Sequence, residues 1–242
     1  MTERWKILQG DCLPLMREMP DASVHAVVTD PPYGLSEHSP AEVLACLSAW
    51  CRGEEYQPTG RGFMGKAWDA WVPGPAYWRG ALRVLEPGGH LLAFAGSRTQ
   101  DLMGMSLRLA GFEIRDCIMW VFGSGFPKSL DISKAIDAAA GAERQVVGTG
   151  KGRTGSAAQP HGASFSDDAY QWPGEFKVTT PATPEAEKWA GWGTALKPAY
   201  EPIIVARKPL GSTVAACVLE HGTGGLHSDG RRVEGAFVSG RA

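Results

Sequence analysis

Apolar residues in this sequence fall into short runs that predict the strands of one sheet. The clearest run, Val24–Val28, is apolar at almost every position, as is typical of a strand buried on both faces of a parallel sheet. Three later runs predict further strands at His90–Ala95, Phe112–Phe122 and Tyr200–Arg207. Trp5–Gln9 predicts one more short strand near the start of the chain.

Between these runs, apolar residues recur three or four positions apart, which is the spacing of one face of a helix. Helices are therefore expected at Leu13–Met19, Ser39–Cys51 and Ala76–Leu85, between Thr99 and Gly111, and at Leu130–Ala140. Pro87-Gly88-Gly89 is expected to end the third helix. Thr99 or Ser97 is available to cap the fourth.

The alternation of strands and helices predicts an α/β fold, a three-layer sandwich with parallel strands at its centre. The connector between Trp5–Gln9 and Val24–Thr29 is short, which favours parallel, neighbouring strands. Parallel strands end at the same edge of a sheet. We therefore expect Asp11 and Asp30, which follow these two strands, to lie at one edge.

The composition changes after Phe122 and suggests three regions. Residues 1–122 form the predicted catalytic core, and residues 190–242 return to that core and end in a glycine-rich, polar tail. The intervening residues 123–189 form a predicted irregular insertion. Within it, Gly148–Pro184 is rich in Gly, Ser, Thr, Ala and Pro and has little periodicity, which favours a surface loop or a segment that orders on a partner.

Composition and charge exclude several classes of protein. Of the 242 residues, 43% are hydrophobic, which is enough for a sizeable core, and the net charge of −2 confines any attraction for nucleic acid to a local patch. The five cysteines lack the spacing of a zinc site, so no metal is expected, and reduced, mostly buried thiols are predicted. No apolar stretch approaches the roughly eighteen residues of a membrane span, so a soluble, cytoplasmic protein is expected.

Candidate chemistry lies where the strand Val24–Thr29 ends, at Asp30-Pro31-Pro32-Tyr33. Neither proline can donate to a sheet ladder, so a carboxylate and an aromatic ring sit on a stiff loop. Open α/β sheets bind ligands at the carboxyl ends of their strands. The Asp30 carboxylate and the Pro31 carbonyl can accept hydrogen bonds from an exocyclic aromatic amine, and Tyr33 can stack on the base. The alternative is a rigid proline turn with a capping aspartate.

Val24–Tyr33, with the preceding Gly10-Asp11-Cys12, resembles amino-group DNA methyltransferases of the permuted class, in which the catalytic motif precedes the cofactor motif. Gly96–Thr99, Ile118–Lys128 and Lys197–Leu210 are similar to segments of phage and prophage adenine-specific methylases. The resemblance implies the Rossmann-like fold of S-adenosylmethionine-dependent methyltransferases, here incomplete and with an irregular insertion. It also implies methyl transfer from S-adenosylmethionine to adenine N6. The substrate it implies is double-stranded DNA with a flipped-out base, within a restriction-modification system.

The same resemblance assigns roles to individual residues. Asp30–Tyr33 match the catalytic motif, and an aspartate in first place resembles the adenine-N6 type. Asp11 matches the position that touches the adenosine part of S-adenosylmethionine, with Cys12 beside it and Asp30 also at the cofactor. The alternative for Asp11 is a helix N-cap.

Basic residues supply candidate contacts to DNA. These are Arg98, Lys128, Lys151 and Arg153. The last three belong to the predicted insertion, whose position between catalytic segments suits a target recognition region that contacts phosphates. A surface salt bridge for Arg98, and a solvated face for the others, are the alternatives.

One departure from the family leaves alternatives open. The glycine-rich cofactor loop, of the form D-P-F-x-G-S-G, is absent, and the nearest substitute, Gly222–Gly225, is interpreted as a loop. A truncated or split methylase that binds DNA and needs a partner chain for its cofactor is therefore a second hypothesis, as is a homo-oligomer. A methyltransferase acting on cytosine N4 or on RNA is a third.

Overall fold

The protein divides into two units, which are described separately. The structure is a computed structural model, and it describes residues 5–36, 38–60, 62, 65–123, 129–151, 175–196 and 199–231. The larger unit comprises residues 1–119 and 202–242, and the smaller unit comprises residues 120–201.

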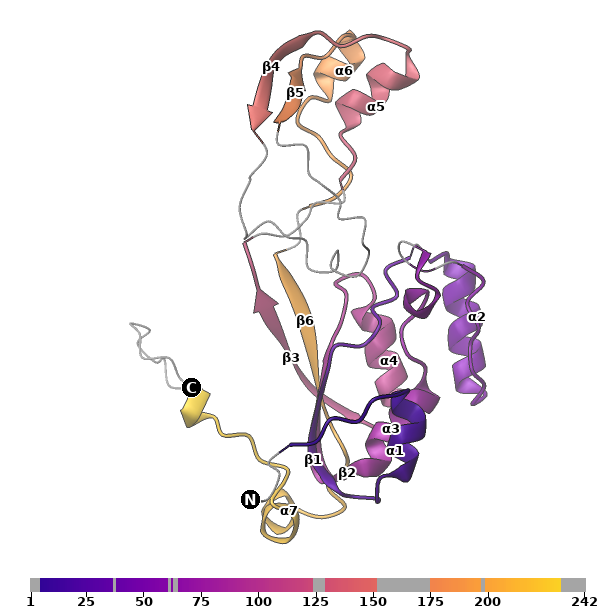
Figure 1. The fold of residues 1–242 in the computed structure, drawn as a ribbon, viewed down its shortest axis with the longest axis vertical. Helices are drawn as coiled ribbons and strands as arrows, with labels where there is room; N and C mark the ends of the chain where they lie inside the picture. The colour runs from indigo at the N-terminus through magenta and orange to yellow at the C-terminus, as the bar shows by residue number, and fades with distance from the viewer. Residues whose placement is uncertain are drawn as a thin grey trace. The chain divides into compact units, whose positions relative to one another are not determined.

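A four-stranded sheet organises the larger unit (Figure 1). Its order is β1 (Val24–Thr29), β2 (Leu85–Phe94), β6 (Tyr200–Arg207) and β3 (Glu113–Val121). β1 and β2 are parallel, whereas β2 and β6 are antiparallel. The α/β class predicted from the sequence is confirmed, but the sheet is mixed. Apolar runs locate strands without fixing their direction, because direction depends on the path of the connections.

The predicted strand at Trp5–Gln9 is wrong. The structure gives this segment no regular secondary structure, and Trp5 is 74% exposed. A strand needs a neighbour to complete its hydrogen bonds, and within the described residues no strand lies beside this segment. β1 consequently forms one edge of the four-stranded sheet, and the expected pairing between the strands that precede Asp11 and Asp30 does not occur.

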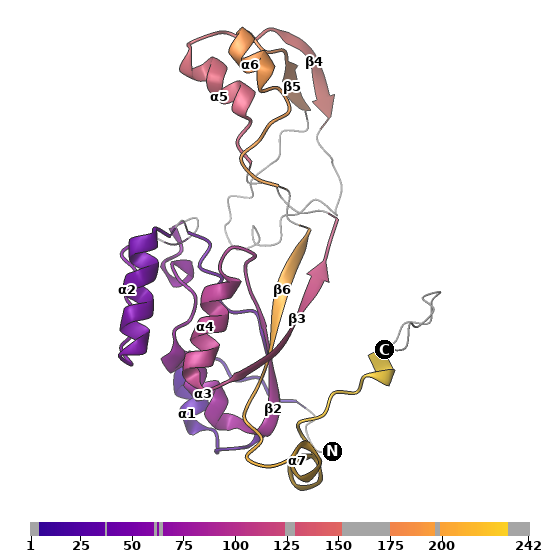
Figure 2. The ribbon, with the colours of Figure 1, turned by 180° about the vertical axis from the view of Figure 1, so that it is seen from behind.

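Four helices lie on one face of this sheet, as Figures 1 and 2 show from opposite sides. They are α1 (Cys12–Glu18), α2 (Pro40–Cys51), α3 (Pro75–Val84) and α4 (Gln100–Ala110). Leu91 and Ala93 of β2 point into this layer and are fully buried. Val28 of β1 pairs with Leu92, faces the other way and is 69% exposed. The predicted three-layer sandwich therefore differs from the described residues, in which these helices form a single layer.

Local sequence explains the limits of these helices. Ser39 caps α2 through a reciprocal capping box with Glu42. Pro75 occupies the first turn of α3, where its missing N–H costs nothing. Gly111 ends α4 with a φ of 108°, which glycine adopts without strain. The predicted boundaries of these helices are confirmed to within a few residues.

Pro87-Gly88-Gly89 does not end a helix, contrary to the prediction, but forms an irregularity inside β2. Helix α7 (Val214–His221), which the sequence pattern did not predict, packs there. The Cys217 thiol donates to the Pro87 carbonyl at 3.2 Å. A Cβ on Gly88 would lie 2.7 Å from the Cys217 sulfur, so the glycine is needed for close approach of α7. A short 3₁₀ turn, η4 (Asp229–Arg231), follows.

All five cysteines are free thiols, as expected, but only Cys46 and Cys217 are buried. The prediction of mostly buried thiols is therefore wrong. Within the described ranges, no helix combines the length and the apolar character that crossing a membrane requires.

The smaller unit is built around a buried aspartate. Its elements are α5 (Ile132–Ala139), β4 (Val146–Lys151), β5 (Glu175–Thr179) and α6 (Pro184–Lys188), with β4 and β5 antiparallel. Asp137 of α5 is 1% exposed and pairs with Arg144 at 2.6 Å. It also accepts hydrogen bonds from the amides of Ala182 and Thr183, both at 3.0 Å. Residues 123–189 were predicted to form an irregular insertion. Their described parts instead contain these regular helices and strands.

This arrangement predicts acid sensitivity of the smaller unit. Burial opposes ionisation of Asp137, but the hydrogen bonds and Arg144 outweigh it and hold the pKa of this carboxyl below its ordinary value. A lowered folded pKa stabilises the fold above the unfolded pKa of about 3.9, and this stability is lost as the pH falls through the folded value. We expect Asp137→Asn to reduce hydrogen-exchange protection of the Ala182 and Thr183 amides at neutral pH and to weaken its acid dependence. The exposed Glu143→Gln variant serves as control and should match the wild type; unchanged protection in Asp137→Asn would contradict the assignment.

Candidate active site

The Asp-Pro-Pro-Tyr motif forms a loop at the carboxyl end of β1, as the sequence predicted. We call Asp30–Tyr33 the DPPY loop. Asp30 is exposed, whereas Pro31 is buried. Within the described residues, neither the Asp30 carboxylate nor the Pro31 carbonyl has a hydrogen-bond partner. Two acceptors are thus available to a ligand at the edge of the sheet.

A buried carboxylate, that of Asp69, fixes the end of the DPPY loop. Asp69 closes the 3₁₀ turn η2 (Ala67–Asp69), and its Oδ1 accepts hydrogen bonds from the amides of Tyr33 at 2.9 Å and Gly34 at 3.0 Å. Gly34 has a φ of 61°, and a Cβ there would lie 2.8 Å from the amide nitrogen of Val72. The loop therefore needs glycine at this position for both its conformation and its packing.

Two further side chains hold the loop from other elements. The Thr99 hydroxyl donates to the Tyr33 carbonyl at 2.6 Å, and His38 Nε2 lies 2.9 Å from the Gly34 carbonyl oxygen. Thr99 stands at the N-cap position of α4, as predicted, but its side chain makes no cap hydrogen bond. Its hydroxyl is committed to the DPPY loop instead.

Asp11 and Cys12, the predicted cofactor residues, lie at the start of α1. Asp11 Oδ1 accepts from the Leu13 amide at 2.9 Å, so the alternative interpretation as an N-cap is observed. The Cys12 sulfur lies 3.1 Å from the Tyr77 hydroxyl. Burial, together with this hydrogen bond, raises the pKa of the Tyr77 phenol. Asp11 Oδ2 is left without a hydrogen bond inside the described residues.

Of the four residues predicted to contact DNA, the structure describes the side chain of Arg98 alone. Arg98 is exposed in the turn after β2, next to Thr99, and so lies at the same edge as the DPPY loop. Lys151 ends β4, but its side chain lies outside the described residues, as do Lys128 and Arg153. Among the described side chains of this group, that of Arg98 lies at the edge of the sheet that carries the DPPY loop.

Sequence inspection did not identify Asp69, His38 or Thr99 as support for the site. Asp69 lies 36 residues from Tyr33, and Thr99 lies 66 residues from it. No local motif marks such separations. The one available signal is the Gly-, Trp- and Pro-rich composition of residues 52–75, which predicts a long loop over the active edge.

The residues present fit part of the predicted methyl donor. The carboxylates of Asp11 and Asp30 are exposed acceptors that suit an adenosine. Gly222 instead ends α7 with a φ of 70°, and Gly224 packs against Leu210 and Cys217, so this glycine segment shapes the α7 region. Within the described part of the chain, no group of His, Cys, Asp or Glu side chains is placed to hold a metal ion.

Comparisons with known proteins place this geometry in context. No protein-family model matches the sequence. The Type II methyltransferase M.HindIII of Haemophilus influenzae is 22% identical over 247 residues, which cover 90% of this chain and 63% of that protein. The chain thus spans less than two thirds of the length of this relative.

Two solved structures are also similar, each with a TM-score of 0.35. The DNA modification methylase TTHA0409 of Thermus thermophilus, complexed with S-adenosyl-L-methionine, is 19% identical; the match covers 83% of this chain and 51% of that one. The M1.HpyAVI–SAM complex is 11% identical, with coverage of 84% and 54%. The chain is therefore distantly similar in sequence to DNA modification methyltransferases.

Proposed function

We propose that this chain carries the catalytic loop of an S-adenosylmethionine-dependent DNA methyltransferase that acts on adenine N6. The observation that carries the proposal is the DPPY loop, whose Asp30 carboxylate and Pro31 carbonyl have no hydrogen-bond partner among the described residues and lie at the carboxyl end of a strand. The sequence similarity to M.HindIII supports the class of reaction. The aspartate in first position supports adenine as the target.

Residues of this chain would activate the target amine by accepting its hydrogens. The lone pair of an exocyclic adenine amine is delocalised into the ring. Hydrogen bonds to the Asp30 carboxylate and the Pro31 carbonyl favour a pyramidal nitrogen whose lone pair is available for attack. Tyr33 would stack on the flipped-out base. Asp69 and Thr99 fix the loop beforehand, so the loop loses little conformational entropy when the base binds.

The donor and the DNA would be held by separate residues. S-adenosylmethionine, when bound, supplies a methyl group activated by its sulfonium. Asp11, with Cys12, is proposed to contact the adenosine through the acceptor that the helix cap leaves free. Arg98 is proposed to contact a DNA phosphate beside the loop, and residues 123–189 are proposed as the recognition region.

A second hypothesis is that the chain acts with a partner that completes the donor site. The specific observation is that β1, which carries the DPPY loop, is an edge strand of the described sheet. Its run of Val and Ala contains no Lys or Pro to protect that edge, and Val28 is largely exposed. Calorimetry with S-adenosylmethionine separates the two hypotheses, because an autonomous enzyme binds the donor without another chain.

Replacement of Asp30 tests the catalytic assignment. We expect Asp30→Ala to lower methyl transfer to DNA at least about a hundredfold, because one of two oriented acceptors is lost. Transfer of tritiated methyl, followed by nucleoside analysis, measures both rate and product. The exposed, distant Asp21→Ala variant is the control. N6-methyladenine is the expected product; N4-methylcytosine or methylated RNA would favour the third hypothesis, and full activity of Asp30→Ala would refute the site.

Replacement of Asp69 tests the support of the loop. Asp69→Ala leaves the amides of Tyr33 and Gly34 without their acceptor, so we expect a loss of about 1–3 kcal/mol in the free energy of unfolding. Methyl transfer should fall as well, although Asp69 touches no substrate. Asp69→Asn keeps an oxygen acceptor and should restore most of the stability. Equal stability of wild type and Asp69→Ala in urea unfolding would contradict this role.

A further inference from the structure

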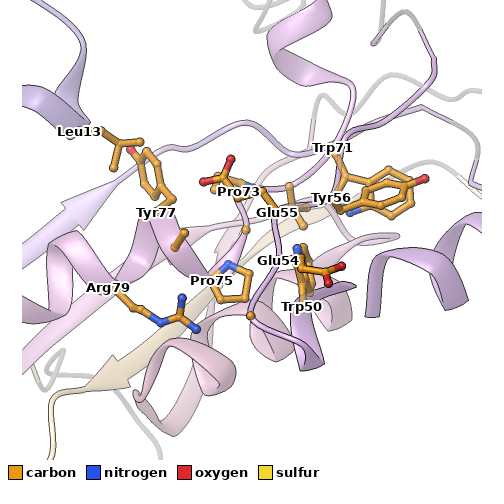
Figure 3. A pocket seen from close by; sticks show the side chains of 14 residues that line it. Leu13, Trp50, Glu54, Glu55, Tyr56, Trp71, Pro73, Pro75, Tyr77 and Arg79 are labelled. Carbon is orange, nitrogen blue, oxygen red and sulfur yellow. The ribbon is translucent and has the colours of Figure 1, made fainter. Parts of the chain in front are cut away.

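A pocket with aromatic walls is lined by residues of α1, α2 and α3 and of the segments 53–56 and 71–74, and none of the predicted site residues lines it (Figure 3). Its volume is about 210 Å³. Tyr77 and Arg79 of α3 lie on one side of it, and Tyr56 and Trp71 lie on the other, as Figure 3 shows. Pockets for drug-sized ligands usually measure about 300–1,000 Å³, so this one suits a molecule of amino-acid size.

The walls of the pocket are held in place before any ligand arrives. The Trp71 indole N–H donates to the Cys46 sulfur at 3.1 Å, and its ring lies 4.8 Å from that of Tyr56. The Pro73 carbonyl, at the base of the same segment, accepts hydrogen bonds from Trp78 at 3.1 Å and Ser106 at 2.7 Å. A preformed pocket loses little entropy when it is filled.

Two side chains of opposite charge at the pocket, Glu55 and Arg79, have no partner among the described residues. Glu54 is engaged by Arg52 in a pair of hydrogen bonds of 2.7 and 3.0 Å. Glu55 and Arg79, in contrast, make no ion pair or hydrogen bond within the described residues. One free carboxylate and one free guanidinium therefore border the same aromatic space.

We propose that this pocket binds an α-amino-acid zwitterion. Arg79 pairs with the ligand carboxylate, since a guanidinium matches that group in a bidentate manner. Glu55 accepts from the ligand ammonium, and the aromatic rings contact the rest of the molecule. A thioether suits these walls because sulfur packs favourably against aromatic rings. Phosphate-bearing ligands are poorly matched to the carboxylates of Glu54 and Glu55, so a DNA backbone is not the occupant.

The pocket is connected to the candidate active site through Trp71. Its ring lies 3.9 Å from that of His38, which contacts the Gly34 carbonyl behind the DPPY loop. Leu13, two residues after Asp11, also lines the pocket. A zwitterion of this kind has two sources: a free amino acid, or the amino-acid end of S-adenosylmethionine. Only the second rests on the proposed function.

Titration calorimetry on the full chain, without DNA, tests the proposal. The probes are L-methionine, L-methioninol, which lacks the carboxylate, and 4-(methylthio)butanoate, which lacks the ammonium. We expect L-methionine to bind, and each of Glu55→Gln and Arg79→Gln to weaken it about tenfold or more. Arg79→Gln should leave methioninol binding unchanged, and Glu55→Gln should leave butanoate binding unchanged. Glu18→Gln, at an exposed carboxylate of α1 that does not line the pocket, is the control and should bind L-methionine as the wild type does.

S-adenosylmethionine and adenosine form the second arm. If both variants weaken the binding of S-adenosylmethionine as much as that of L-methionine, the pocket holds the amino-acid end of the donor. If the two variants weaken the binding of L-methionine and leave that of S-adenosylmethionine unchanged, the ligand is a free amino acid. The proposal is overturned if no L-methionine or S-adenosylmethionine binds up to about 10 mM, or if binding is indifferent to both variants. Because these measurements need no methyl transfer, they are independent of the Asp30→Ala result.

Discussion

The candidate active site depends on the buried carboxylate of Asp69, which gathers the amides of Tyr33 and Gly34 on a single oxygen. Two amides left unsatisfied in this position would each cost free energy, so the loop has one preferred course. The Thr99 hydroxyl donates to the Tyr33 carbonyl, which lies between these two amides. With the backbone fixed in this way, the side chain of Asp30 and the carbonyl of Pro31 remain available outside the sheet.

The strand that carries the DPPY loop, β1, is an edge strand of the described sheet. β1 pairs with β2 on one side, and the described sheet ends on its other side. An apolar strand in such a place ordinarily has a neighbour or a protected edge. The chain also spans only part of the length of M.HindIII. The exposed edge of β1 is the observation behind the second hypothesis, in which a partner chain completes the proposed donor site.

The smaller unit shows how a small core is held together by polar contacts. Asp137 receives hydrogen bonds from Arg144 and from the amides of Ala182 and Thr183, which come from separate parts of the unit. A buried charge is tolerable only when its hydrogen bonds are satisfied, so this network constrains the path of the chain around α5. Arg144 also donates to the Thr179 hydroxyl of β5 at 3.0 Å, which ties this network to the strand pair.

The sequence by itself determined where most strands and helices lie, and it identified the DPPY loop at the end of β1. These features are local: apolar spacing, caps and prolines act over a few residues. Only the tertiary structure decided that Trp5–Gln9 is not a strand, that β6 runs against β2, and that Asp69 supports Tyr33. Each of these depends on a partner distant in the sequence, because sheet neighbours and buried acceptors are chosen by the path of the whole chain and leave no mark in local pattern.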